Sequence, residues 1–170
     1  MIKKGIVLFF LLGTFNVLIG QDGMTNQKIE DVLTGMTNEV SGYPGYWEML
    51  YRDRQLVCLT DEDNNRMRII SPIIEAKSLE KELLLDLLTA NFHAALDVKY
   101  AISQGVLWSV YIHPLEELSD GELEGAINQV VNAVDNFGTT FSSTKMVFGG
   151  NSPQKITEIQ EEEKPIMQKL

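Results

Sequence analysis

The stretch that decides the fold is residues 96–113, which reads LDVKYAISQGVLWSVYIH. Apolar and polar side chains alternate along both halves of it, a period-2 pattern that is typical of half-buried β-strands. The alternation breaks at Gln104-Gly105 and then resumes, and a short glycine-containing break between two such runs indicates a β-hairpin. In the second half we expect the core face to consist of Val106, Trp108, Val110 and Ile112.

A helix follows this hairpin, and the sequence marks where it begins. Ser119 and Glu122 are spaced as a capping box, in which each side chain satisfies a backbone amide of the other residue. Leu118 and Leu123 flank the box as the two members of a hydrophobic staple do. Apolar side chains then recur at the helical period, at Leu123, Ile127, Val130, Val131, Val134, Phe137 and Phe141.

The residues before the hairpin predict two more helices with strands between them. Residues 24–40 have an amphipathic helical pattern, which the cluster Gly42-Tyr43-Pro44-Gly45 ends. Ser78 begins a leucine-rich helix that we expect to end near Phe92. The sequence therefore predicts an α+β fold in the order α-β-β-β-α-β-β-α, an antiparallel sheet of about five strands with helices on one face. The first three strands are expected at residues 46–52, 55–60 and 66–74.

Composition indicates one folded domain with an acidic surface. The chain has 170 residues, of which 44% are hydrophobic, and its formal net charge is −10. We expect the domain at residues 21–148 and a flexible acidic tail at residues 149–170. The negative charge argues against nucleic-acid partners, because phosphate neutralisation needs clustered lysines and arginines. It also disfavours binding to anionic lipid headgroups.

The N-terminus has the pattern of a secretory signal peptide. Lys3-Lys4 forms a basic region, and an apolar region follows at residues 6–19. We expect residues 1–20 to be removed by cleavage near Gly20-Gln21, which would place the protein in the periplasm of a Gram-negative bacterium or outside the cell. The apolar region is shorter than the ~20 residues of a membrane-spanning helix, which favours cleavage over the alternative of an uncleaved membrane anchor.

One segment partly matches a calcium-binding loop. Asp61, Asp63 and Asn65 occupy the first three ligand positions of such a loop. Arg66 and Pro72 stand where the loop requires a glycine and a bidentate glutamate. The sequence therefore favours a solvated polar turn over a metal site.

No other motif indicates catalysis or a cofactor. His93 and His113 are the only histidines and lie in different predicted elements, whereas zinc sites need more ligands at short spacings. Nucleophile elbows and phosphate-binding glycine loops are absent from the sequence. Cys58 is the only cysteine, and its strand-forming neighbours predict a buried thiol; an intermolecular disulfide is the alternative. We therefore expect no catalytic residues, no metal and no cofactor, and predict that the protein is not an enzyme.

Four features of the chain occur together in one known fold. They are the leucine-rich helix ending near Asn91, the turn at Gly105-Val106-Leu107-Trp108, the His113-Pro114-Leu115 loop and the helix start at Leu118 to Leu123. With the order of elements, they resemble the type III secretion chaperone-like fold, and within it the YbjN-type (sensory transduction regulator-like) branch. The resemblance covers residues 24–148. It implies a homodimeric protein-binding module with no cofactor. Secretion chaperones are cytoplasmic, whereas this chain carries an export pattern, so their role in secreting clients does not carry over directly.

The hairpin also suggests where a protein would bind. If Trp108 faces the core, Leu107 and Tyr111 point to the opposite face, with Ala101 beside them on the neighbouring strand. Apolar side chains on a solvated face are typical of dimer or client surfaces, so these three residues are the candidate partner interface. The alternative is that the tail or the first helix covers them.

The function predicted from sequence is an exported, chaperone-like protein-binding module. We expect it to form homodimers and to bind a protein client whose identity the sequence does not reveal. Two other classes remain as alternatives. One is an envelope enzyme or small-ligand binder whose site assembles across elements, and the other is a membrane-tethered structural protein.

Overall fold

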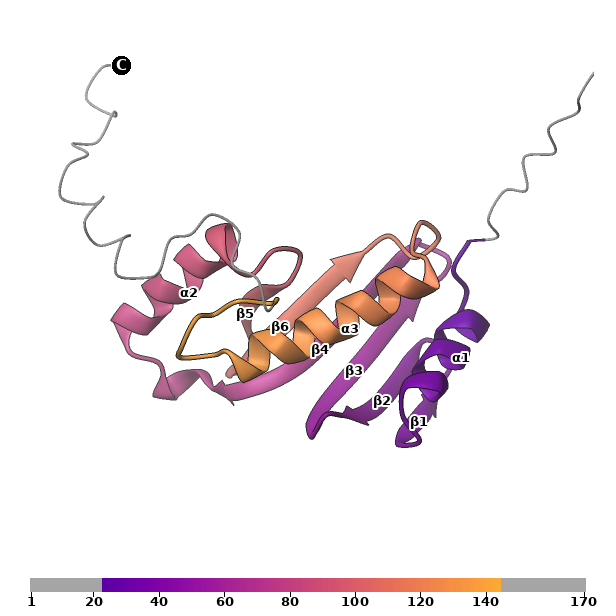
Figure 1. Cartoon of the computed structure of the whole chain (residues 1–170), viewed down its shortest axis with the longest axis horizontal. Coiled ribbons are helices and arrows are strands. Elements are labelled where there is room, and N and C mark those ends of the chain that lie inside the picture. The colour runs from indigo at the N-terminus through magenta and orange to yellow at the C-terminus, as the bar shows by residue number, and fades with distance from the viewer. Residues whose placement is uncertain (1–22, 145–170) are drawn as a thin grey trace, which may run out of the picture.

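The structure is a computed structural model that describes residues 23–144, so the predicted signal peptide and the whole predicted tail at residues 149–170 lie outside the described residues. None of the helices in this part of the chain is long and apolar enough to cross a membrane. The elements follow in the order α1 (Asn26–Met36), β1 (Val40–Tyr43), β2 (Tyr46–Tyr51), β3 (Arg54–Asp61), β4 (Arg66–Glu75), the short 3-10 helix η1 (Ala76–Ser78), α2 (Lys81–His93), β5 (Lys99–Ser103), β6 (Val106–His113) and α3 (Asp120–Asp135) (Figure 1).

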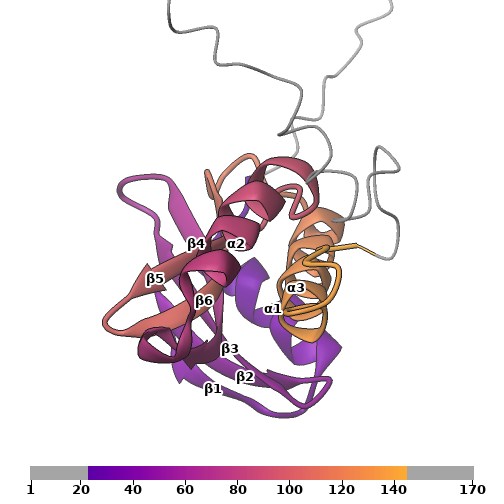
Figure 2. The ribbon, with the colours of Figure 1, turned by 90° about the vertical axis from the view of Figure 1, so that its left-hand side faces the viewer.

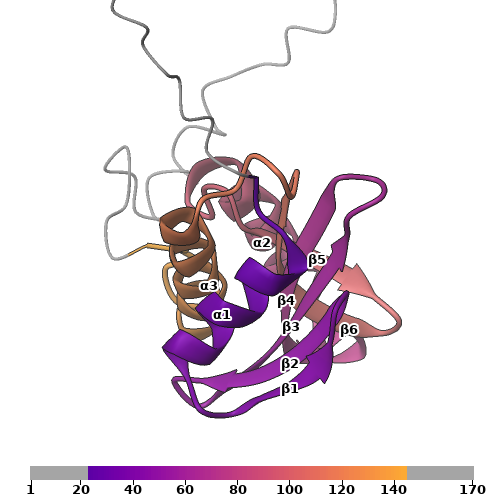
Figure 3. The ribbon, with the colours of Figure 1, turned by 90° about the vertical axis from the view of Figure 1, so that its right-hand side faces the viewer.

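The strands form one antiparallel sheet in the order β1-β2-β3-β4-β6-β5. Helices α1 and α3 lie side by side against one face of this sheet, and α2 packs near its β5 edge (Figures 2 and 3). The α+β class and the antiparallel arrangement predicted from sequence are therefore confirmed. The sheet has six strands instead of about five.

The additional strand is β1, which lies in residues that the sequence pattern assigned to a helix end and a chain break. Helix α1 ends at Met36, and Val40–Tyr43 pairs with β2 through a hairpin turn at Pro44-Gly45. The φ angle of Gly45 is +101°, a conformation that favours glycine, so the supposed break is a tight turn. A side chain at Gly42 would clash with the carbonyl oxygen of Tyr46, so this strand position requires glycine.

The β5–β6 hairpin forms where it was predicted, but the core face of β6 is the opposite of the expected one. Leu107 is 1% exposed and Tyr111 is 7% exposed, so both lie in the core. Trp108 is only half-buried and Ile112 is 55% exposed. The prediction that Leu107 and Tyr111 point away from the core is wrong. Ala101 does lie on the outer face, where its partner across the strands is Trp108.

Ser109 explains why the apolar pattern of β6 was misleading. This serine is fully buried, and its hydroxyl donates a hydrogen bond of 3.0 Å to the carbonyl oxygen of Val130 on α3. Directly opposite lies Ser71 of β4, whose hydroxyl donates to the carbonyl oxygen of Gln55 at 2.7 Å. Because both hydroxyls have partners, burying them costs little. The pair of small side chains also leaves room for α3 against the middle of the sheet.

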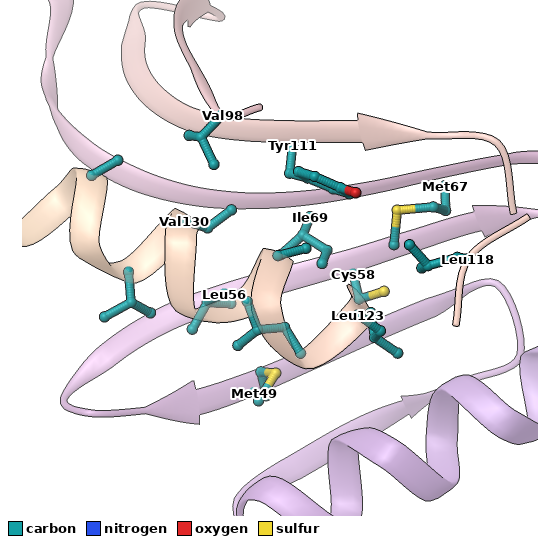
Figure 4. Close-up of a cluster of buried hydrophobic side chains, with 14 of the residues drawn as sticks. Met49, Leu56, Cys58, Met67, Ile69, Val98, Tyr111, Leu118, Leu123 and Val130 are labelled. Atoms are coloured by element: carbon teal, nitrogen blue, oxygen red, sulfur yellow. The ribbon is translucent and has the colours of Figure 1, made fainter. Parts of the chain in front are cut away.

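The core fills the space between the sheet and helices α1 and α3. Figure 4 shows Tyr111 and Cys58 among the apolar side chains of this cluster, with Val130 reaching it from α3. Helix α3 has the longest buried face, formed by Leu123, Ala126, Ile127, Val130, Val131, Ala133 and Val134.

The predicted capping box begins α3. The hydroxyl of Ser119 accepts from the backbone N–H of Glu122, and the N–H of Ser119 donates to the Glu122 carboxylate at 2.8 Å. These bonds to the charged carboxylate lower the pKa of Glu122. The helix ends at Asp135, earlier than its apolar pattern predicts. Phe137 and Phe141 lie beyond it and pack edge to face on each other.

Candidate protein-binding surfaces

The described residues hold no arrangement of side chains suited to metal binding. Within residues 23–144 no group of three or more histidine, cysteine, aspartate or glutamate side chains could hold a metal ion. The calcium-like segment forms the turn between β3 and β4, where the Asp61 carboxylate accepts from the backbone N–H of Asn64 at 3.1 Å and from its side-chain amide at 2.8 Å. These internal bonds are what a polar hairpin turn requires.

Cys58 is buried in the core, as its sequence context predicts. Burial raises the pKa of its thiol from the ordinary value of 9.0 to about 12. Because the thiolate is the nucleophilic form, Cys58 is inert at neutral pH in the folded protein. The unfolded chain releases this proton near pH 9 and the folded chain only near 12, so the thiol lowers stability as the pH rises between these values.

A surface hollow of about 570 Å³ lies beside the start of α1. Two of its polar side chains are engaged within the chain. The Lys28 ammonium donates to the carbonyl oxygen of Gly23 at 3.0 Å, and the Glu62 carboxylate accepts from the backbone N–H of Asn26 at 2.7 Å. These two bonds hold the start of α1 in place.

The face of the sheet opposite to α1 and α3 carries many apolar side chains. Cross-strand pairing places Val57, Ile70 and Val110 in one row on neighbouring strands. Leu59 and Ile112 lie in the next row, and Trp108 extends the surface in the other direction. No element within residues 23–144 covers this side (Figures 2 and 3). We call this side of the sheet the open face, and its apolar residues are Val57, Leu59, Ile70, Pro72, Ala101, Trp108, Val110 and Ile112.

A second apolar surface, which residues 23–144 leave uncovered, lies on α2. Leu85 is 55% exposed, Leu88 is 66% exposed and Phe92 is 85% exposed. Residues at this spacing share one face of a helix, while Leu87 and Ala90 on the other side are buried in the core. We call Leu85, Leu88 and Phe92 the α2 strip. In Figure 1 it belongs to the end of the molecule remote from α1.

Asn91 closes the outer edge of β5. Its side-chain oxygen accepts from the backbone N–H of Tyr100 at 2.7 Å, and its side-chain amide donates to the carbonyl oxygen of Tyr100 at 3.0 Å. The other edge of β5 pairs with β6, so Asn91 occupies the position that a further strand would take. The sequence pattern predicts that this helix ends near Phe92, and α2 ends at His93, but the pattern does not reveal that the Asn91 side chain bonds the sheet edge.

The comparisons with known proteins support the fold and nothing finer. No protein-family model matches the chain, and no curated protein matches it. Among solved structures, a chain in the HopA1–SchA chaperone–effector complex is 16% identical, with a TM-score of 0.51 over 66% of this chain and 94% of that one. A chain in the ExsC–ExsE complex is 12% identical, with a TM-score of 0.52 over 65% and 87% of the two chains.

A third similar structure is the Yersinia pestis type III secretion chaperone SycH in complex with a stable fragment of YscM2. The identity is 11% and the TM-score 0.52, over 66% of this chain and 98% of that one. At such identities the likeness concerns the fold. The chain has a type III secretion chaperone-like fold, which confirms the resemblance seen in the sequence, while its YbjN-type assignment stays a prediction.

Proposed function

We propose that this protein is an exported, non-enzymatic, chaperone-like module that binds another protein and acts as a homodimer. The observation that carries the proposal is the open face, an apolar sheet surface left uncovered by the described residues on a chaperone-like fold. Apolar surfaces of this kind mark interaction sites on soluble proteins. Three structural neighbours are chains of complexes between two proteins, which supports a protein as the partner.

Export and binding can be tested in one experiment. The full chain is expressed in a Gram-negative host with a photocrosslinking amino acid at Trp108 on the open face. We expect the protein in the periplasm, beginning at Gln21, with one discrete crosslinked protein band. The matched control places the same amino acid at Asp63, an exposed residue of the β3–β4 turn, where no such band is expected. A product that begins at Met1 would contradict export, and absence of the band at Trp108 would contradict binding at the open face.

The α2 strip is the surface that we assign to the dimer. Two copies related by a two-fold axis bring the same residues together, so their contact must be self-complementary. The chain carries a formal net charge of −10, so two copies repel each other, and a contact without charged groups adds no further repulsion at the interface. Leu85, Leu88 and Phe92 provide such an uncharged contact.

Leu88→Asp is expected to convert the dimer into a monomer. The substitution would place two carboxylates, one from each copy, at the middle of the apolar contact. Loss of a central interface side chain typically costs at least ~2 kcal/mol, which raises the dissociation constant about thirtyfold. Sedimentation velocity at several concentrations measures the change. Ile112→Asp on the open face is the matched control and should remain dimeric, since Ile112 is also exposed. A monomeric wild-type protein would exclude the dimer.

A further inference from the structure

The open face also carries two arginines that have no acidic partner within residues 23–144. Arg68 of β4 lies between Leu59 and Ile112 on the neighbouring strands, and Arg66 lies opposite Asp61 at the end of the same strands. Both side chains are exposed, and within residues 23–144 neither forms an ion pair or a hydrogen bond. The other two arginines are different, because Arg52 and Arg54 both pair with Asp135 of α3.

The carboxylates on this face are already engaged by neighbours of their own. The Glu48 carboxylate accepts a hydrogen bond from the Tyr46 hydroxyl, which raises the pKa of that tyrosine. The Asp61 carboxylate accepts two bonds from Asn64 in the adjacent turn. The two arginines therefore remain available for carboxylates from outside the described chain, with which a guanidinium makes paired hydrogen bonds.

Register along β4 and β6 orders these groups in a line. From one end of the open face to the other, the chain presents Pro72 beside Trp108, then Ile70 beside Val110, then Arg68 beside Ile112, and finally Arg66. An extended segment lying along these strands would meet apolar side chains first and guanidinium groups last. Because the protein as a whole is acidic, an acidic segment would be repelled by most of the remaining surface.

We propose that the open face binds an extended segment of the partner protein whose apolar side chains are followed by aspartates or glutamates. The apolar side chains cover Trp108, Val110 and Ile112, and the carboxylates pair with Arg68 and Arg66. This inference rests on the proposed binding function and specifies the chemistry of the partner. On the same face of a second copy, the carboxylates of Glu48 and Asp61 already accept hydrogen bonds from Tyr46 and Asn64 of that copy, so a partner segment with unengaged carboxylates fits Arg68 and Arg66 better.

Selection from a random peptide library displayed on phage tests this inference. The target is the chain from Gln21 to Leu170, and the selected peptides are synthesised for affinity measurements by fluorescence anisotropy. We expect peptides that combine apolar residues with neighbouring carboxylates. Arg66→Ala/Arg68→Ala should weaken their binding about tenfold or more, and rising salt should weaken binding to the wild type. The matched control Arg52→Ala/Arg54→Ala removes the same charge elsewhere and should bind them like the wild type.

Several outcomes would overturn the inference while leaving the proposed function standing. Selected peptides without acidic residues would exclude the charge pairing, and so would equal affinity for the Arg66→Ala/Arg68→Ala protein. Peptides whose binding is lost in Leu88→Asp but kept in Val110→Asp would place the site on α2.

Residues 156–163, ITEIQEEE, also combine apolar residues with carboxylates, and they lie outside the described residues. If peptides bind only after residues 149–170 are deleted, the occupant is the chain itself and the partner assignment is wrong. Absence of the crosslinked band at Trp108, in contrast, would remove the proposed binding function itself.

Discussion

Leu107→Asp is expected to leave the protein unfolded, whereas the same substitution at Val110, on the opposite face of the same strand, should leave it folded. Leu107 is 1% exposed and has no cationic neighbour in the core cluster. Burying an unpaired carboxylate costs several kcal/mol, and the burial of the leucine is lost as well. The free energy of unfolding of a typical domain is about 5–15 kcal/mol, so this one change removes most of it.

Val110→Asp is the matched control for Leu107→Asp. Val110 is half-buried on the open face, and its partner on β5 is Lys99, which would face the new carboxylate. Circular dichroism during urea unfolding measures both variants. We expect a cooperative transition close to that of the wild type for Val110→Asp and no cooperative transition for Leu107→Asp. If Leu107→Asp folds and Val110→Asp does not, then Val110 lies in the core and Leu107 on the outer face, as the sequence pattern predicted.

Asn91→Ala is expected to lower the free energy of unfolding by about 2–4 kcal/mol. The substitution removes two hydrogen bonds and leaves the backbone N–H and carbonyl of Tyr100 without their partner. It also uncovers the outer edge of β5, and an exposed strand edge pairs readily with other chains. The variant should therefore aggregate at lower concentration than the wild type, in addition to unfolding at lower denaturant concentration.

Two further variants test whether the loss of stability comes from the bonds of Asn91 to Tyr100, because removing an amide side chain elsewhere on the surface should have little effect. Asn64→Ala removes an exposed side chain whose bonds go to Asp61 in a turn, and it should change the free energy of unfolding by less than about 1 kcal/mol. Asn91→Asp keeps the acceptor for the N–H of Tyr100 and loses the donor to its carbonyl. Its free energy of unfolding should therefore fall by at least half as much as that of Asn91→Ala. Urea unfolding and light scattering measure these properties. An Asn91→Ala protein as stable as Asn64→Ala would show that the side chain does not hold the edge.

The parts of the fold that local sequence determines were predictable. The β5–β6 hairpin, the capping box at Ser119 and the leucine-rich helix all follow from spacing within a few residues. Burial of Cys58 between strand formers was predictable for the same reason. Each of these depends on periodicity or capping, which operate without knowledge of the rest of the chain.

The features that depend on distant residues were not predictable. On β6, counting apolar side chains favours Val106, Trp108, Val110 and Ile112, but Ser71 and Ser109 meet under α3 and decide which face is buried. Strand β1 exists because β2 pairs with it, and a Pro-Gly turn alone does not reveal this partner.

The three residues of the predicted partner interface do not lie on one face of the sheet. Ala101 lies on the open face, whereas Leu107 and Tyr111 are core residues. The open face can be recognised only when the pairing of β3, β4 and β6 is known. The role of Asn91 likewise depends on the position of β5.

The place of β6 between β4 and β5 has a consequence for the order in which the chain folds. Strands β1 to β4 pair with their neighbours in sequence and can associate as soon as they leave the ribosome. The other edge of β4 stays unpaired until β6 is available, and β6 follows α2 and β5 in the sequence. Such non-local pairing is slow, because the chain loses the entropy of closing a long loop before any stabilising contact forms. Until Val106–His113 emerges, the nascent chain therefore has an incomplete sheet in which one edge of β4 lacks its partner strand.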